Sequence, residues 1–253
     1  MEETILTAQN LKFRYDSDQP VYALDGVSTE VKRGEFVAVL GANGCGKSTL
    51  IKTTFGTVRH QAGAITLDDQ PISRFSPREL ASCLGYVGQD ANCPFNFSVR
   101  DVVSMGLYAR KEPKNGKQIV ADAMEELGVS ALADRNIQSL SGGERKMVFI
   151  ARAIAQGAQM LILDEPTNHL DIRHQLFVMD YLKQSRKDTL LVIHDLRLAA
   201  HYCDYLYMIC DGRVYAQGTP EQVLCLENVR HVFGVEGHAG DTPSGAGDFI
   251  LFP

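Results

Sequence analysis

A glycine-rich segment carries the clearest chemical signal in this sequence. Its nine residues are Gly41, Ala42, Asn43, Gly44, Cys45, Gly46, Lys47, Ser48 and Thr49. Glycine allows a tight backbone path, so that successive N–H groups can point inward at an anion. The Lys47 ammonium can reach the outer phosphates of a nucleotide, and the Ser48 hydroxyl can offer an oxygen to Mg²⁺. This phosphate loop predicts a binding site for a nucleoside triphosphate.

Two elements must flank this loop if it is to bind phosphate. Residues 36–40 form an apolar run typical of a buried strand, and residues 48–54 can begin a helix. A helix N-terminus adds partial positive charge where the phosphates would lie. The alternative is a glycine turn that merely contains a lysine, and the order of strand, loop and helix disfavours it.

Two adjacent carboxylates form the second chemical element. Four apolar residues, 160–163, lead directly into Asp164 and Glu165. Both acids should therefore lie at the carboxyl end of a buried strand, the edge where ligands bind in open α/β sheets. Asp164 can hold Mg²⁺, because a hard cation prefers oxygen ligands, and Glu165 can orient and polarise an attacking water as a general base. The alternative is two acids that cap a strand before a proline turn.

A serine–glycine segment that opens a helix forms the third element. Residues 140–144 read Leu-Ser-Gly-Gly-Glu, and the apolar residues after them follow helical spacing: Met147, Ile150, Ala151, Ile154 and Ala155. Ser141 and Glu144 match a capping box. A capping box does not need two glycines, whereas the N–H groups of Gly142 and Gly143 beside a serine hydroxyl can bind phosphate. Because the chain already has one phosphate loop, this second surface most simply serves a nucleotide held by another copy.

Composition and charge limit the classes of function. The 253 residues are 45% hydrophobic and 22% charged, which suits one large compact domain. A net charge of −6 argues against broad attraction to nucleic acid, which we do not expect as a partner. The apolar runs are far shorter than the roughly 20 residues that span a bilayer, and the acidic start is unlike a signal peptide. We therefore expect a cytosolic protein that reaches a membrane only through a partner.

Cysteine usage agrees with a cytosolic setting. The six cysteines form no CxxC pair and have no histidines at zinc spacing, and cytosolic thiols stay reduced. Cys45 differs from the others because it lies in the phosphate loop near a helix N-terminus. We expect the thiolate to be favoured there, so that oxidation of Cys45 could block the nucleotide.

The order of the expected elements indicates an α/β fold. We expect strands at residues 4–8, 36–40, 160–163 and 190–193, turns at 16–18 and 32–34, helices over 98–128 with a polar break at 111–116, and a glycine-rich loop at 237–247. The early strands should form a small β subdomain that leads into the phosphate loop. The later strands should lie in a buried parallel sheet.

Together these motifs resemble the ATP-binding subunit of an ATP-binding cassette (ABC) transporter, from Tyr15 to about Phe233. Four further residues match family positions in the family's order: Tyr15 the adenine-stacking aromatic, Gln89 the Q-loop glutamine, Asp171 the D-loop aspartate and His194 the switch histidine. Each alone has an ordinary structural alternative: a strand aromatic, a loop amide, a helix N-cap and a histidine at a strand end. Their common order disfavours coincidence.

The resemblance implies a phosphate-loop NTPase core with an N-terminal antiparallel β subdomain and an inserted helical subdomain. Residues 1–253 would form a single ABC ATP-binding domain. Its core and β subdomain would cover 1–90 and 157–235, its helical subdomain with the signature motif about 91–156, and a tail 236–253.

The resemblance also implies a mechanism and partners. Each ATP, with Mg²⁺, would lie between the phosphate loop of one copy and Ser141 and Gly143 of a second copy, in a head-to-tail dimer. Glu165 would polarise water, His194 would contact the γ-phosphate, and Gln89 would sense Mg²⁺ or water while its loop touches an integral membrane permease. The subunit would lie peripherally on the cytoplasmic face of the membrane, with an extracytoplasmic substrate-binding protein as an indirect partner.

Sequence segments that are less specific than these motifs indicate a subfamily. Residues 168–175, 202–204, 212–221 and 232–235 are similar to importers of iron-siderophores, haem and vitamin B12, and iron-siderophore is the cargo we expect first. Position 144 departs from the family, because it is glutamate where glutamine is most frequent. The substitution adds negative charge near the partner's nucleotide.

Two other functions compete with that of a transporter. ABC-type translation factors also combine these motifs, but they typically carry two cassettes joined by a charged linker, whereas this chain shows one cassette and no such linker. A phosphate-loop kinase of small molecules leaves residues 140–144 unexplained.

Overall fold

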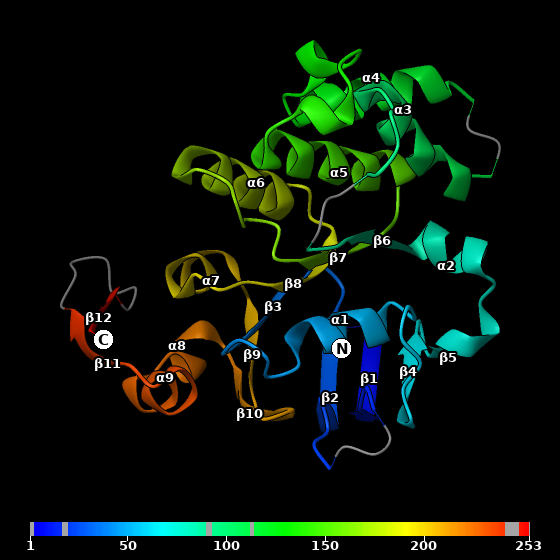
Figure 1. The fold of residues 1–253 in the computed structure, drawn as a ribbon. Helices are drawn as coiled ribbons and strands as arrows, with labels where there is room; N and C mark the ends of the chain where they lie inside the picture. Colours follow the sequence, from blue (N-terminus) through cyan, green and yellow to red (C-terminus); the bar gives the residue numbers. More distant parts are fainter. Residues whose placement is uncertain (1–2, 17–19, 90–92, 112–113, 241–247, 253) are drawn as a thin grey trace. The chain divides into compact units, whose positions relative to one another are not determined.

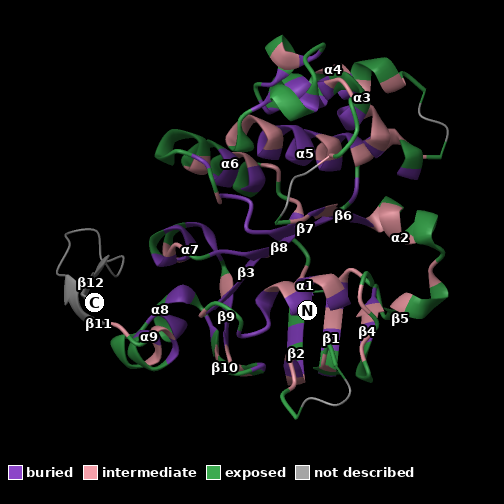
Figure 2. Cartoon of the chain, viewed as in Figure 1, coloured by how far each residue is buried: buried purple, intermediate pink, exposed green. Residues whose placement is uncertain are grey.

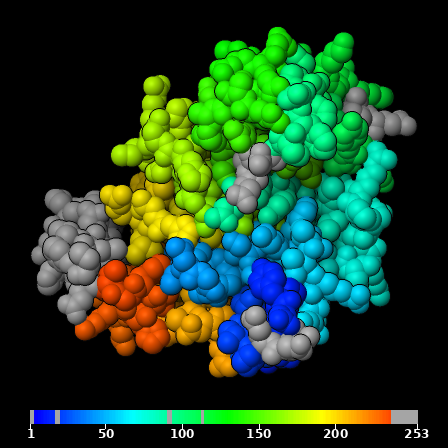
Figure 3. Space-filling view, in the orientation of Figure 1, coloured from blue at the N-terminus to red at the C-terminus, as the bar shows by residue number. Residues whose placement is uncertain are grey.

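The computed structural model describes residues 3–16, 20–89, 93–111, 114–240 and 248–252, drawn as a ribbon in Figure 1. Contacts divide the chain into two compact units: Met1–Arg74 with Lys183–Pro253 (unit 1), and Phe75–Leu182 (unit 2). In Figure 3 unit 2 runs in colour from cyan through green to yellow-green, and unit 1 has the colours before and after. Each unit holds a different part of the predicted chemistry.

A parallel arrangement of strands forms the centre of unit 1. Its strands are β3 (Phe36–Gly41), β8 (Asp188–Val192), β9 (Tyr205–Cys210) and β10 (Arg213–Gly218), in the order β10, β9, β3, β8. β3 pairs in parallel with β8 and β9, and β10 pairs antiparallel with β9. Every residue of β3 and β8 is buried, as Figure 2 shows by colour. The strands predicted at 36–40 and 190–193 are thereby confirmed, although β8 ends at Val192. The expectation that residues 36–40 belong to the small β subdomain is wrong, because β3 pairs with β8 and β9 and not with the antiparallel strands.

A second, antiparallel sheet in unit 1 is larger than the sequence predicted. It contains β1 (Thr4–Phe13), β2 (Leu24–Lys32), β4 (Ala62–Leu67) and β5 (Gln70–Pro71), in the order β2, β1, β4, β5. Only part of β1 was predicted. β1 is irregular, with register shifts against β2 and a positive φ of 50° at Asn10, and such irregularity breaks the two-residue alternation that marks a strand.

The remaining elements of unit 1 are short helices and a strand pair. They are α1 (Lys47–Thr54), the 3₁₀ helix η1 (Ile72–Arg74), α7 (Leu196–Tyr202), α8 (Pro220–Val223), α9 (Leu226–Phe233), β11 (Glu236–Gly240) and β12 (Asp248–Phe252). β11 and β12 pair antiparallel, so the predicted loop at 237–247 is wrong for 237–240. A partner strand farther along the chain supplies the hydrogen bonds that a glycine-rich segment cannot indicate by itself. Residues 241–247 lie outside the described part.

Unit 2 contains the predicted helices together with two strands. Its elements are α2 (Pro77–Cys83), β6 (Leu84–Val87), α3 (Val99–Ser104), η2 (Met105–Ala109), α4 (Gly116–Glu126), η3 (Ser130–Leu132), η4 (Ile137–Ser139), α5 (Gly142–Gln156), β7 (Met160–Asp164) and α6 (Ile172–Gln184), whose last two residues belong to unit 1. Helices over 98–128 and a strand at 160–163 are confirmed. Residues 112–113 of the polar break lie outside the described residues.

Unit 2 covers more of the chain than the helical subdomain, whose bounds stay a prediction. That subdomain was predicted over about 91–156, whereas unit 2 begins at Phe75 and ends at Leu182. The reason is that β6 pairs in parallel with β7 and that α5 donates hydrogen bonds to carbonyls of β6. These strands therefore group with the helices.

Helix α5 is buried more extensively than an amphipathic surface helix. Met147, Ile150, Ala151 and Ala155 are buried as predicted, and Ile154 is half-buried. Gly106 of η2 allows close packing here, because a Cβ at that position would collide with the Arg152 carbonyl on α5.

Candidate functional site

The phosphate loop of unit 1 adopts a path that requires glycine. It connects β3 to α1, with positive φ angles of 148° at Gly41 and 111° at Gly46. A Cβ on Gly41 would collide with the Ile209 carbonyl of β9, and one on Gly46 would collide with the Ala23 carbonyl. Two glycines are thus needed for backbone approach, as expected of a loop whose N–H groups surround an anion.

Lys47 lies across this loop. Its side chain is buried, and Nζ donates to the Gly41 and Ala42 carbonyls at 2.8 Å each. The ammonium charge is therefore held inside the loop by its own backbone. Ser48 is half-buried, and Asn43 and Gly44 are exposed.

Tyr15 contacts the helix that follows the phosphate loop. Its Oη lies 3.0 Å from the Thr49 hydroxyl, and its ring packs edge-on against Phe13 with centroids 5.0 Å apart. The side chain is nevertheless 69% exposed. An exposed ring fixed by its hydroxyl suits the stacking of an adenine base.

Cys45 does not have the environment that was predicted for it. The side chain is buried, and burial raises the pKa of its thiol, an effect that the nearby Lys47 charge only partly offsets. The expectation of a favoured thiolate is wrong, because loss of solvation outweighs the helix N-terminus.

Glu165 is the centre of the site in unit 2. It follows directly after β7, whose last residue, Asp164, is fully buried. Glu165 is 6% exposed and has a positive φ of 53°, a conformation that is uncommon for a residue other than glycine. Gln89 Nε2 donates to Glu165 Oε2 at 3.0 Å, and Asn168 Nδ2 donates to the same oxygen. Two amides therefore hold one carboxylate oxygen.

Asn168 was not predicted as a residue that acts on Glu165. The sequence placed it only at the start of the D-loop segment. The spacing of the two residues could have indicated the contact, because a tight turn brings residues three positions apart close together. The structure has such a turn, in which the Asn168 N–H donates to the Glu165 carbonyl at 3.3 Å.

The signature segment forms both of the structures that its sequence allowed. Ser141 is the N-cap of α5 and makes a complete capping box with Glu144. The same residues line a cavity of 720 Å³, and the predicted D-loop aspartate, Asp171, lines it too. The lining includes Ser141, Gly142, Gly143, Glu144, Met147, His169, Leu170, Asp171 and His174. A helix N-terminus that opens onto a cavity suits a phosphate.

Asp171 has a structural role on this cavity. Its Oδ1 accepts from the His174 backbone N–H at 2.8 Å and lies 2.9 Å from His174 Nδ1. These contacts hold the pKa of Asp171 below its ordinary value. The aspartate therefore caps the first turn of α6, the ordinary alternative, and also lines the cavity.

Glu144 is tied to Ser141 by its carboxylate. Oε2 accepts from the Ser141 N–H at 2.8 Å and from the Ser141 hydroxyl at 2.9 Å, while the Glu144 N–H donates to Ser141 Oγ at 3.2 Å. These bonds hold the pKa of Glu144 below its ordinary value. The hydroxyl proton of Ser141 is therefore directed at a carboxylate.

The predicted residues fall into two sets, one in each unit. The loop 41–49, Tyr15 and an exposed His194, two residues after β8, belong to unit 1. Unit 2 holds Gln89, Asp164, Glu165, Ser141 with its two glycines, and Asp171.

The donor atoms of the predicted magnesium ligands fit Mg²⁺. Ser48, Gln89 and Asp164 offer a hydroxyl, an amide oxygen and a carboxylate, the hard oxygen ligands that this ion prefers. No three His, Cys, Asp or Glu side chains of the described residues gather as a metal site. Ser48 belongs to unit 1, and Gln89 and Asp164 belong to unit 2.

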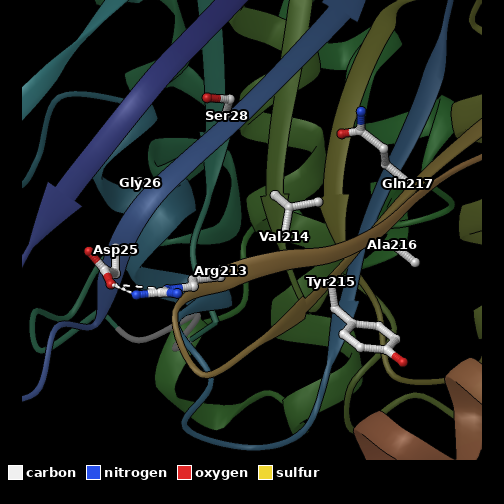
Figure 4. A pocket seen from close by; sticks show the side chains of 8 residues that line it. All are labelled: Asp25, Gly26, Ser28, Arg213, Val214, Tyr215, Ala216 and Gln217. Carbon is white, nitrogen blue, oxygen red and sulfur yellow. Dashed lines mark hydrogen bonds and ion pairs between the residues drawn. The ribbon is translucent and has the colours of Figure 1, made fainter.

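A separate hollow in unit 1 is lined by none of these residues. The cavity of 470 Å³ is formed along β2 and β10 and contains no predicted site residue (Figure 4). Arg213 Nε donates to Asp25 at 3.0 Å, and Lys12 also donates to Asp25, which lowers the pKa of that carboxyl. This hollow is stabilised by an ion-pair cluster that has no evident link to nucleotide chemistry.

Comparison with known proteins identifies the family. A family model described as "ABC transporter" matches residues 24–168, more than half of the chain.

The chain belongs to the ABC transporter family.

Relatives of this cassette include several ATP-binding proteins of importers. The hemin import ATP-binding protein HmuV of Hahella chejuensis is 40% identical over 84% of this chain and 87% of its own length. The ferric enterobactin transport ATP-binding protein FepC of Escherichia coli is 32% identical over 90% and 88%. The cobalamin import ATP-binding protein BtuD of Halobacterium salinarum is 38% identical over 87% of this chain, which spans 57% of that protein.

A solved structure agrees with the fold of the cassette. An inward-facing conformation of a putative metal-chelate type ABC transporter matches with a TM-score of 0.81 and 28% identity, covering 99% of this chain and 98% of the other. The predicted family and the predicted ABC ATPase fold are confirmed. No helix within the described residues is long and apolar enough to cross a membrane.

Proposed function

We propose that this cassette hydrolyses ATP and thereby powers an importer of metal chelates or related compounds. The observation that carries the proposal is Glu165, a buried carboxylate at the end of β7 whose Oε2 accepts from Gln89 and Asn168. Amides on one oxygen fix the carboxylate's orientation, and a fixed carboxylate is what a general base needs to polarise an attacking water.

Binding of ATP would rest on unit 1. The loop 41–49 offers N–H groups and the Lys47 ammonium to the phosphates, and Tyr15 offers its exposed face to the adenine. His194 would contact the γ-phosphate. Mg²⁺ held by Ser48, Gln89 and Asp164 would neutralise phosphate charge when bound.

The cassette would act as a head-to-tail dimer. The N-terminus of α5 with Ser141 and Gly143 borders a cavity in its own unit, which suits the γ-phosphate of an ATP held by a second copy. The closed dimer would be favoured only while that phosphate remains, so hydrolysis would release it.

The dimer would transmit this cycle to integral membrane permease subunits through the segment after Gln89, on the cytoplasmic face of the membrane. An extracytoplasmic binding protein would deliver the cargo. The relatives' names point to hemin, cobalamin and ferric enterobactin, and an iron-siderophore is the cargo we propose. Because the permease and the binding protein contact the cargo, its identity depends on them.

Replacement of Glu165 by glutamine tests the chemistry. The variant keeps the size of the side chain but removes the base, so we expect ATP binding to remain, turnover to fall about 10²- to 10⁴-fold, and an ATP-bound dimer to accumulate. Turnover is measured as phosphate release and the dimer by size exclusion. Glu125→Gln, an exposed carboxylate on α4, is the matched control. Hydrolysis at the wild-type rate in Glu165→Gln would refute the assignment.

Affinity purification from mildly solubilised native membranes tests the biological role. We expect a polytopic permease to accompany the tagged protein, and its identity narrows the cargo. Ribosomal proteins without a permease would instead support the translation-factor alternative.

A further inference from the structure

Three polar side chains of α5 donate to carbonyls along β6 and the segment after it. Gln156 Nε2 donates to the Leu84 carbonyl at 2.8 Å, Arg152 Nη2 to the Tyr86 carbonyl at 3.1 Å, and Lys146 Nζ to the Gly88 carbonyl at 3.2 Å. We call these three contacts the α5–β6 ladder. All of its members belong to unit 2.

The geometry of the ladder is regular. Leu84, Tyr86 and Gly88 are two residues apart, so their carbonyls point to the same side of the strand. In the sheet order of the described strands β6 has one hydrogen-bonded neighbour, β7, and the ladder covers its other edge. Gln156 lies ten residues after Lys146, a rise of about 15 Å along a helix, and Gly88 lies four residues after Leu84, a span of about 13 Å along a strand. Helix and strand therefore run antiparallel over similar lengths.

Lys146 is the member of the ladder that is connected to the proposed general base, Glu165. Its side chain is 2% exposed, and Nζ also donates to the Gln89 carbonyl at 2.9 Å. Gln89 in turn donates to Glu165 at 3.0 Å. A buried ammonium that binds carbonyls makes charge-assisted bonds, which are stronger than neutral ones.

The other end of this connection is the signature segment. Lys146 lies five residues after Ser141, on the first turns of the same helix. A displacement of the N-terminus of α5 can therefore move Gln89 through the Lys146 side chain, and it can move Glu165 through the side chains of Lys146 and Gln89.

We propose that Lys146 is a positioning residue that couples the signature segment to the general base of the same chain. The coupling rests on the proposed ATP-sandwich dimer. When Ser141 engages the nucleotide of the second copy, Lys146 holds Gln89 where it orients Glu165, so that each chain hydrolyses its own ATP only while it also contacts its partner's. Occupancy of one nucleotide site thus activates the other, and hydrolysis depends cooperatively on ATP.

Lys146→Met tests this role because methionine fills the buried space without the donor. In the purified full-length protein we expect a fall of about tenfold in kcat and a Hill coefficient for ATP that drops from above 1 towards 1, where two coupled sites allow at most 2. Binding of a fluorescent ATP analogue should stay within about twofold, because Lys146 lies outside the phosphate loop. Lys146→Arg keeps the cation and should recover at least half of the cooperativity.

Two members of the ladder provide matched controls. Arg152→Met and Gln156→Met remove equivalent contacts farther from Gln89, so they should lower the melting temperature but leave the Hill coefficient unchanged. The proposal is overturned if Lys146→Met keeps the wild-type kcat and Hill coefficient, or if the two controls lose cooperativity equally. Should Lys146→Met not fold, Lys146→Leu, which also has no donor, gives the same comparison. Failure of the wild-type protein to hydrolyse ATP would contradict the proposed function instead.

Discussion

Glu144 offers a sharp test of how the signature segment meets a nucleotide. Its carboxylate accepts from the Ser141 hydroxyl at 2.9 Å and from the Ser141 N–H at 2.8 Å. A hydroxyl has one proton, so Ser141 can donate to a phosphate only by giving up its bond to Glu144. Glutamine at this position keeps an acceptor of the same length but removes the charge that strengthens the bond.

The magnitude follows from the difference between the two acceptors. Hydrogen bonds to charged groups contribute about 1.5–3 kcal/mol and neutral ones about 0.5–1.5 kcal/mol, a difference of about 1 kcal/mol. The Glu144 side chain is 38% exposed, and solvent screening reduces the difference to about 0.5–1 kcal/mol. We therefore expect Glu144→Gln to tighten ATP-dependent dimerisation by about two- to fivefold.

Sedimentation in the Glu165→Gln background, where ATP stays intact, measures the ATP concentration that gives half-maximal dimer. Glu79→Gln is the matched control, since Glu79 makes the same capping box with Ser76 at α2. An unchanged or higher midpoint for Glu144→Gln would refute the reasoning. The reasoning would also be refuted if Glu144→Gln still tightened dimerisation in a Ser141→Ala background. That result would show that the Glu144 charge repels the nucleotide, and not that Glu144 competes with it for the Ser141 hydroxyl proton.

The pH dependence of this effect has a definite sign. Ser141 holds the pKa of Glu144 below its ordinary value, so the carboxylate stays charged to a lower pH than that of an ordinary glutamate. Its contribution to the capping box is present above the ordinary glutamate pKa and is lost as the pH falls through the lowered pKa. The difference in dimerisation between the protein with Glu144 and its Glu144→Gln variant should thus be constant between about pH 6 and 8.

Two further predictions concern the phosphate loop. Lys47→Ala removes the charge held against the Gly41 and Ala42 carbonyls, and it should weaken ATP binding by about tenfold or more in a fluorescence titration. The control variant Lys52→Ala, on the same helix, should keep the wild-type affinity for ATP. Equal affinities of the two variants would contradict the role of Lys47. Because burial raises the pKa of Cys45, its alkylation at pH 7–8, followed by mass spectrometry, should be slower than that of the exposed Cys225. Faster alkylation of Cys45 at neutral pH would restore the thiolate hypothesis.

Local signals in the sequence predicted most of the chemistry. The strand before the phosphate loop, the helix after it and the two acids at the end of β7 were all predicted, because apolar runs, glycines and carboxylates act through the conformation of their own segment. The capping box of Ser141 and Glu144 was predicted for the same reason: its two partners are three residues apart.

Contacts between distant segments were decided only by the tertiary structure. Gln89 and Glu165 are 76 residues apart, and nothing in either segment indicates that an amide of one holds a carboxylate oxygen of the other. Lys146 stands in the sequence as a lysine within an amphipathic helix, and only the packing of α5 along β6 shows which carbonyls it binds.

Burial and strand pairing account for the predictions that were wrong. The helix N-terminus favoured a Cys45 thiolate, but the fold buries the side chain, and desolvation of a charge outweighs a partial helix dipole. The glycine-rich residues 237–240 form a strand because residues 248–251 pair with them. In both cases the sequence determined the local conformational preference and the titratable group, whereas the tertiary structure set the solvation and the hydrogen-bond partners, which depend on segments elsewhere in the chain.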